Sequence, residues 1–143
     1  MKTKRQIIKS LATEFSQTFN QNLVVVELPD HSLSYQNYII KLVNHRWRIF
    51  NHNLDEIDSY NLKSCALLAA KHRYCKKFNQ LNTIRLLDEN YSVNYHDVKL
   101  YESFIQTVDQ DRYDIILSRL DYARQKSDFY KSQITKLFRK DFR

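Results

Sequence analysis

The chain has 143 residues, is 43% hydrophobic and 13% aromatic, and carries a net charge of +7. This length suits one domain with its own core, and the composition excludes global disorder. Glycine is absent, which excludes the phosphate-binding P-loop, the glycine-rich dinucleotide turn and the nucleophile elbow. NTPases, Rossmann oxidoreductases and α/β-hydrolases are therefore set aside.

Residues 3–20 predict an amphipathic helix. Ile7, Leu11, Phe15 and Phe19 recur every four residues and form one apolar stripe. The basic start of the chain leads into this stripe and not into a continuous apolar segment with a cleavage site. No apolar run approaches the roughly 20 residues of a membrane span. We therefore expect a cytoplasmic protein with no signal peptide and no membrane contact.

The next segments predict a small antiparallel sheet. Leu23–Leu28 is short and β-branched and ends at Pro29, which is typical of a strand. After a polar loop, residues 38–43 and 46–50 predict either one long strand or two strands that turn at Asn44-His45. Asparagine tolerates the left-handed backbone of a tight turn. The pattern therefore favours a sheet of two or three strands.

Another residue must replace glycine wherever a turn or a helix end needs a positive φ. Asparagine is the usual substitute. We expect element boundaries at the asparagines between the predicted segments, which are Asn20, Asn22, Asn44, Asn51, Asn53, Asn79 and Asn90.

The chain beyond these strands is predicted to be mainly helical. Residues 58–79 are apolar over a wide arc, which predicts a largely buried helix. Residues 81–87 fit either a helical turn or a strand that returns at Asp88-Glu89-Asn90, and residues 95–108 predict a further helix. The expected fold is a single α+β domain over 1–143. A helix and a small antiparallel sheet occupy 1–53, and a helical half over 54–143 ends in a long helix.

The last helix carries a heptad stripe that begins near residue 113. About 30 residues of helix would be roughly 45 Å long, so one end is expected to project or to dimerise. The stripe can instead pack on the helix at 58–79, which is the interpretation we favour. The residues proposed as an interaction surface are Tyr113, Ile116, Leu120, Tyr130, Ile134 and Leu137.

Positive charge is concentrated towards the two ends of the sequence. The net charge is +6 over residues 1–77, −4 over 78–114 and +5 over 115–143. Clustered cations favour a polyanionic partner, although an AT-rich coding sequence would also enrich lysine. The residues expected to contact nucleic acid are Lys4, Arg5, Lys9, Arg46, Trp47, Arg48, Lys71, Arg73, Lys76, Lys77, Lys136, Arg139 and Lys140.

Trp47 has two interpretations. An aromatic ring beside arginines on a strand can stack on single-stranded bases. A lone tryptophan on an alternating strand is also typical of a core anchor.

No metal site, cofactor or catalytic residue is predicted. Cys65 lies two helical turns from His72 and further still from Cys75, so the three side chains cannot reach one ion. Asp30 and Lys41 partly resemble the metal site of PD-(D/E)xK nucleases. That family needs an acid two residues before the lysine, and this chain has Ile39 there.

The leading hypothesis is a non-enzymatic basic protein that binds nucleic acid or a nucleoprotein complex. In composition it is similar to small accessory or regulatory proteins of phages and mobile elements. The alternative is a protein–protein module (an inhibitor, adaptor or assembly factor, or a homodimer) that acts through the C-terminal helix. A metal-dependent nuclease is third.

Overall fold

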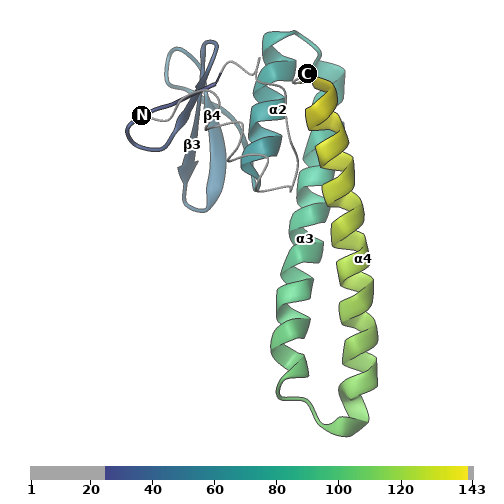
Figure 1. Cartoon of the computed structure of the whole chain (residues 1–143). Coiled ribbons are helices and arrows are strands. Elements are labelled where there is room, and N and C mark those ends of the chain that lie inside the picture. Colours follow the sequence, from purple (N-terminus) through teal and green to yellow (C-terminus); the bar gives the residue numbers. More distant parts are fainter. Residues whose placement is uncertain (1–24, 142–143) are drawn as a thin grey trace.

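A computed structural model of the protein describes residues 25–141 and shows an α+β fold. Figure 1 shows three layers: an antiparallel sheet, the helix α2 beside it, and the paired long helices α3 and α4. We call the sheet with α2 the head, and α3 with α4 the arm. The helix predicted over 3–20 lies outside the described residues, as do Lys4, Arg5 and Lys9.

The sheet has five strands in residues 25–141, and each strand pairs antiparallel with the next. The prediction of two or three strands is therefore wrong. The second strand lies in the predicted polar loop, and the fifth lies in the half expected to be helical. The strands are β1 (Val26–Glu27), β2 (Leu33–Tyr35), β3 (Tyr38–Val43), β4 (Arg46–Phe50) and β5 (Glu56–Tyr60).

The β3–β4 segment forms two strands and not one. Val43 pairs with Arg46, so the loop has only two residues. Asn44 and His45 have φ values of 52° and 65°, the left-handed pair that matches the twist of a tight hairpin. Of the asparagines predicted at element boundaries, Asn44 is the only one in residues 25–141 with a positive φ. Besides Asn44 and His45, the residues with a positive φ in this range are His31, Gln36, Leu54 and Lys76. Each of them carries a Cβ, and the left-handed backbone costs about 1–2 kcal/mol.

Helix α2 (Lys63–Tyr74) lies between the sheet and the arm. Every residue from Ser64 to Ala70 is buried, which confirms the prediction of a largely buried helix. The small alanine side chains let both neighbours approach closely. The helix starts later than the predicted 58–79 because residues 58–60 belong to β5.

The arm consists of α3 (Leu81–Ile105) and α4 (Gln110–Asp141), preceded by a short 3-10 turn (Phe78–Gln80). The 32 residues of α4 span about 48 Å, which confirms the predicted long C-terminal helix. The arm therefore extends well beyond α2 (Figure 1). Among residues 25–141, neither these helices nor α2 is long and apolar enough to cross a lipid bilayer.

The core is concentrated where the arm passes α2. Ile40 and Ile49 of the sheet, Leu67 of α2, Ile84 of α3 and Phe138 of α4 belong to one buried cluster. The distal arm has a separate, much smaller cluster of Val98, Leu120 and Ala123 with Tyr101 packed against it. Away from the head, the arm therefore has a thin core.

Asp88 links the arm to the start of α2. Its buried carboxylate accepts hydrogen bonds from the backbone N–H groups of Asn61 (2.8 Å) and Leu62 (2.9 Å). Burial raises the pKa of Asp88 above its usual range, and the two N–H donors offset part of that rise. Leu62, the residue just before α2, has a side chain that accepts no hydrogen bond from the helix. The carboxylate of Asp88 on α3 therefore supplies an acceptor at the start of α2.

We expect the Asp88→Ala variant to lower the free energy of unfolding by about 2 kcal/mol, because two partly buried backbone N–H groups lose their acceptor. Urea unfolding measures the change. The matched control is Glu89→Ala, the exposed neighbour on the same helix, with an expected change below about 0.5 kcal/mol. Equal stabilities of the two variants would contradict this role for Asp88.

Candidate nucleic-acid interface at the basic end

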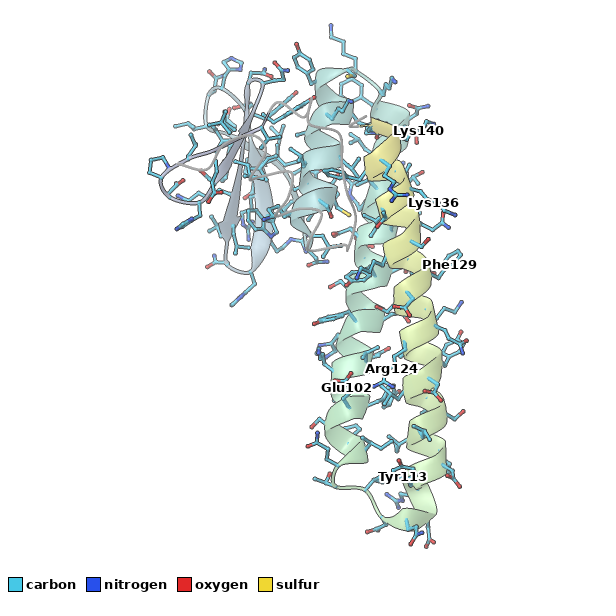
Figure 2. All side chains as sticks on the ribbon, in the orientation of Figure 1. Glu102, Tyr113, Arg124, Phe129, Lys136 and Lys140 are labelled. Atoms are coloured by element: carbon cyan, nitrogen blue, oxygen red, sulfur yellow. The ribbon has the colours of Figure 1, made fainter. Side chains whose placement is uncertain are left out.

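The C-terminal ends of α2 and α4 lie side by side. His72 Nε2 donates a hydrogen bond to Asp141 Oδ2 at 2.6 Å, and both side chains are almost fully buried. Figure 2 shows Lys136 and Lys140 on the stretch of α4 beside α2. Basic residues 62 to 64 positions apart in the sequence therefore lie at the same end of the molecule. We call Lys76, Lys77, Arg139 and Lys140 the basic end; all four are exposed and have no ion-pair partner within residues 25–141.

The backbone after α2 places two of these lysines. The N–H of Lys77 bonds to the carbonyl of His72 at 2.8 Å, and the N–H of Lys76 bonds to the carbonyl of Arg73 at 3.1 Å. With φ of 59° at Lys76, this is a Schellman ending in which a lysine takes the usual position of glycine. The cations of the basic end also lie at the negative ends of two helix dipoles, which accounts for part of their concentration.

A shallow hollow of about 540 Å³ adjoins this helix end. The ring of Tyr35 meets Tyr74 edge to face at 6.2 Å between centroids. Burial, with the nearby Cys75, Tyr74 and Asp141, raises the pKa of Tyr35 to about 12, so this hydroxyl stays neutral at physiological pH. The residues that line the hollow are Gln36, Asn37, Tyr38, Arg73, Tyr74 and Lys76.

The hollow combines tyrosine rings with cations, the residue types that stack a base and hold a phosphate. Arg73 and Lys76 were predicted from the sequence, whereas Tyr38 and Tyr74 were not. Tyr74 lies inside the basic run over 71–77, and this aromatic among lysines was the signal that could have revealed it.

The arginines predicted on β4 are held within the sheet. Arg46 donates to the side-chain and backbone oxygens of Ser59 and to Asn61 Oδ1, each at 2.9 Å. Arg48 donates to the Val43 carbonyl and forms an ion pair with Glu56 at 2.9 Å. These guanidinium groups already have partners and lie on a different element from the basic end.

Trp47 packs against the main core, with Lys63 Nζ at 5.5 Å from the centre of its ring. This packing favours the interpretation of Trp47 as a core anchor over that of a base-stacking surface.

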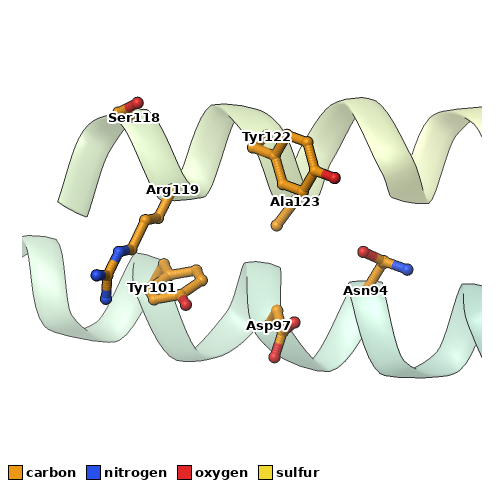
Figure 3. Close-up of a pocket in the computed structure, with 7 residues that line it drawn as sticks. All are labelled: Asn94, Asp97, Tyr101, Ser118, Arg119, Tyr122 and Ala123. Atoms are coloured by element: carbon orange, nitrogen blue, oxygen red, sulfur yellow. The ribbon is translucent and has the colours of Figure 1, made fainter. Parts of the chain in front are cut away.

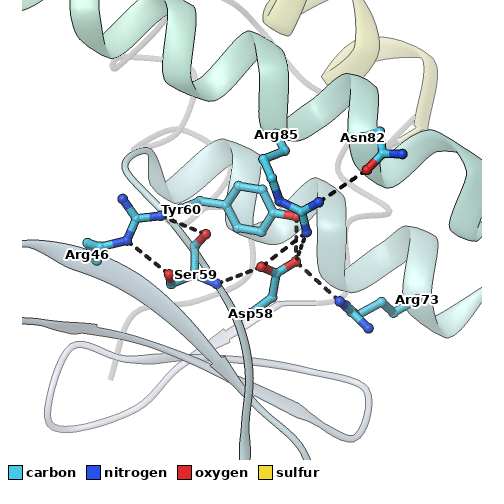
Figure 4. A network of polar contacts seen from close by, with 7 residues as sticks. All are labelled: Arg46, Asp58, Ser59, Tyr60, Arg73, Asn82 and Arg85. Carbon is cyan, nitrogen blue, oxygen red and sulfur yellow. Dashed lines mark hydrogen bonds and ion pairs between the residues drawn. The ribbon is translucent and has the colours of Figure 1, made fainter.

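Asp58 forms ion pairs with two further arginines. Its Oδ2 accepts hydrogen bonds from the Tyr60 hydroxyl (2.7 Å), Arg73 (3.3 Å) and Arg85 (3.2 Å) (Figure 4). Burial raises the pKa of Asp58, but the hydrogen bonds from Tyr60, Ser59 and Arg73 and the charge of Arg85 outweigh it, so the pKa lies below its usual range. Arg73 therefore lines the hollow with its charge partly balanced, because it shares the carboxylate of Asp58 with Arg85.

The remaining predicted residues are distributed as follows. Lys71 is half-buried and has a contact within the chain, and Lys136 is exposed one turn before Lys140. No three His, Cys, Asp or Glu side chains in residues 25–141 gather as a metal site.

The predicted heptad stripe packs chiefly on α3 and the main core. Leu120 and Ile134 are buried, and Ile116, Tyr130 and Leu137 are partly buried. Tyr113, near the tip of the arm, is exposed. Most of the stripe is therefore occupied within the molecule.

No protein-family model matches the chain, and neither the curated proteins nor the solved structures that were compared with it include a match.

The depressed pKa of Asp58 predicts a pH dependence of stability. Folding favours the charged carboxylate of Asp58. Its contribution to the free energy of unfolding is therefore fully present above the ordinary aspartate pKa of about 3.9, and it is lost as the pH falls through the lower pKa of the folded protein. In urea unfolding at a series of acidic pH values, we expect wild-type stability to fall more steeply below about pH 5 than that of Asp58→Asn. Asp55→Asn, at an exposed position, should keep the wild-type slope. A wild-type slope in Asp58→Asn would contradict the network.

Proposed function

We propose that the protein is a non-enzymatic binding protein whose basic end contacts the phosphate backbone of a nucleic acid, free or within a nucleoprotein assembly. The observation that carries this proposal is the convergence of Lys76 and Lys77 with Arg139 and Lys140. Charges from two separate helix ends are joined there through the His72–Asp141 contact. The four cations are exposed and have no acidic partner among the described residues, so they can exchange counterions for phosphates.

The hollow beside the basic end supports a single-stranded ligand. The half-exposed Tyr74 ring borders a space that Lys76 also lines. A base stacked on this ring would place its phosphates near the neighbouring lysines. Stacking and phosphate contacts hold a strand without reading base edges, so we expect binding with little sequence preference.

We expect Lys77→Gln combined with Lys140→Gln to weaken binding of short single-stranded oligonucleotides. Removal of two phosphate contacts should reduce the slope of log affinity against log salt by about 1.5. Fluorescence anisotropy over a salt series measures both quantities.

The matched control is Lys99→Gln combined with Arg112→Gln, which removes two charges from the distal arm. It should bind like wild type. Absence of wild-type binding at low salt, or equal losses in the two double variants, would overturn the proposed function.

A further inference from the structure

Arg73 of α2 is held more loosely than the arginines of the sheet. Arg46 donates three hydrogen bonds, each at 2.9 Å. The one ion pair of Arg73 among the described residues is with Asp58 Oδ2, at 3.3 Å. Its Nε is buried and has no hydrogen-bond partner within residues 25–141. A guanidinium group carries five N–H donors, so most donors of Arg73 are left for water or a ligand.

The carboxylate of Asp58 keeps other partners when Arg73 leaves it. It accepts hydrogen bonds from the Tyr60 hydroxyl at 2.7 Å and from the backbone N–H of Ser59 at 2.9 Å, and its ion pair with Arg85 is at 3.2 Å (Figure 4). The Asp58 side chain is only 11% exposed, and loss of its last cation would leave a buried charge unpaired. Because Arg85 stays in place, release of Arg73 avoids that cost.

Arg73 also borders the hollow at the end of α2, beside Lys76 and the Tyr74 ring. None of the described residues that line this hollow is acidic, and Asp58 is not one of them. A phosphate group can take a guanidinium through two parallel hydrogen bonds of about 2.7–2.9 Å, shorter than the present contact with Asp58. An anion in the hollow can therefore compete with Asp58 for Arg73.

We propose that Arg73 exchanges Asp58 for a phosphate group of the bound strand, so that Asp58 acts as an internal competitor at the hollow. The inference rests on the proposed function and names how that function is regulated. Asp58 is a positioning residue, since it acts on the ligand only through Arg73. Its carboxylate is charged at neutral pH, because its pKa lies below the usual range, so the competition operates under physiological conditions.

The exchange selects ligands that carry several phosphates. A free phosphate ion or a mononucleotide has to displace Asp58 with the binding energy of one site. A strand already held by Lys77 and Lys140 of the basic end brings its next phosphate to the hollow at a high effective concentration. The polyanion is therefore preferred over its monomer.

A second hollow supplies a matched control for Arg73. It has a volume of about 460 Å³ and lies between the arm helices, with Asp97 and Tyr101 of α3 and Arg119 of α4 in its lining (Figure 3). Arg119 is exposed and lies about 30 Å of helix before Arg139. Arg119→Gln therefore removes the same charge without touching the proposed site.

Binding of a short fluorescein-labelled oligothymidylate to the full chain is measured by fluorescence anisotropy at physiological ionic strength, which screens distant charges. We expect Asp58→Asn to tighten binding about threefold or more, and Arg73→Gln to weaken it by a similar factor. In the Arg73→Gln background, Asp58→Asn should have little effect, because the contested group is gone. Arg119→Gln and Asp55→Asn, the controls at exposed positions, should bind within about twofold of wild type.

Absence of wild-type binding would overturn the proposed function and this inference with it. When the wild-type protein binds, unchanged or weaker binding by a folded Asp58→Asn variant would overturn the exchange alone. Equal tightening by Asp58→Asn in the wild-type and Arg73→Gln backgrounds would also overturn it, since the effect would not pass through Arg73. Circular dichroism shows whether each variant is folded. If Asp58→Asn is not, Arg73→Gln decides: weaker binding than Arg119→Gln supports the exchange, and wild-type affinity overturns it.

Discussion

Helix α2 is held at both ends by carboxylates from the arm. At its start, Asp88 of α3 accepts the backbone N–H groups of Asn61 and Leu62. At its end, Asp141 of α4 accepts a hydrogen bond from the buried His72. Because the buried faces of α2 also contact the sheet, these two contacts fix the arm relative to the whole head.

The positions of the basic end and of the exposed apolar residues of α4 follow from this constraint and from helix length. The 12 residues of α2 span about 18 Å, whereas α4 spans about 48 Å. The His72–Asp141 contact aligns the C-terminal ends of these helices. The basic residues at the two C-terminal ends therefore lie together beside the head. The rest of α4 has no head to pack against, so its outer apolar residues stay exposed. The cations of the basic end and the outer apolar residues of α4 therefore lie in different parts of the molecule.

Several elements could be predicted from the sequence because their patterns are long or have a strong local cause. The strands at 38–43 and 46–50 have the predicted bounds, and Asn44 takes the left-handed turn between them. The long C-terminal helix follows from its heptads. Strands β2 and β5 were not predicted because three and five residues are too few to show a clear alternation of apolar and polar side chains. The acidic residues of β5 also resemble those at the start of a helix. The asparagine rule failed at His31, Gln36, Leu54 and Lys76, which lie in tight turns or at a helix end where the local hydrogen bonds need a positive φ whatever residue is present.

The candidate site was only partly predictable, because sequence reasoning finds charges but not their partners. Lys76, Lys77, Arg139 and Lys140 were all among the predicted contact residues, in two separate clusters. Their placement at one end of the molecule depends on a contact between residues 72 and 141. Arg46 is hydrogen-bonded to Ser59 on the neighbouring strand, and a partner 13 residues away could not be identified from the sequence. Asp88 was read as part of a possible turn, and its actual role as a cap on another helix has no local signature.

The coupling between His72 and Asp141 tests the proposed basic end most directly, because the basic end exists only if the C-terminal ends of α2 and α4 lie side by side. A double-mutant cycle with His72→Gln and Asp141→Asn, followed by urea unfolding at neutral pH, measures their coupling. For a buried hydrogen bond to a carboxylate we predict a coupling free energy of about 1–2 kcal/mol. Additive single effects, with no coupling, would show that the two helix ends are not in contact and would contradict the account.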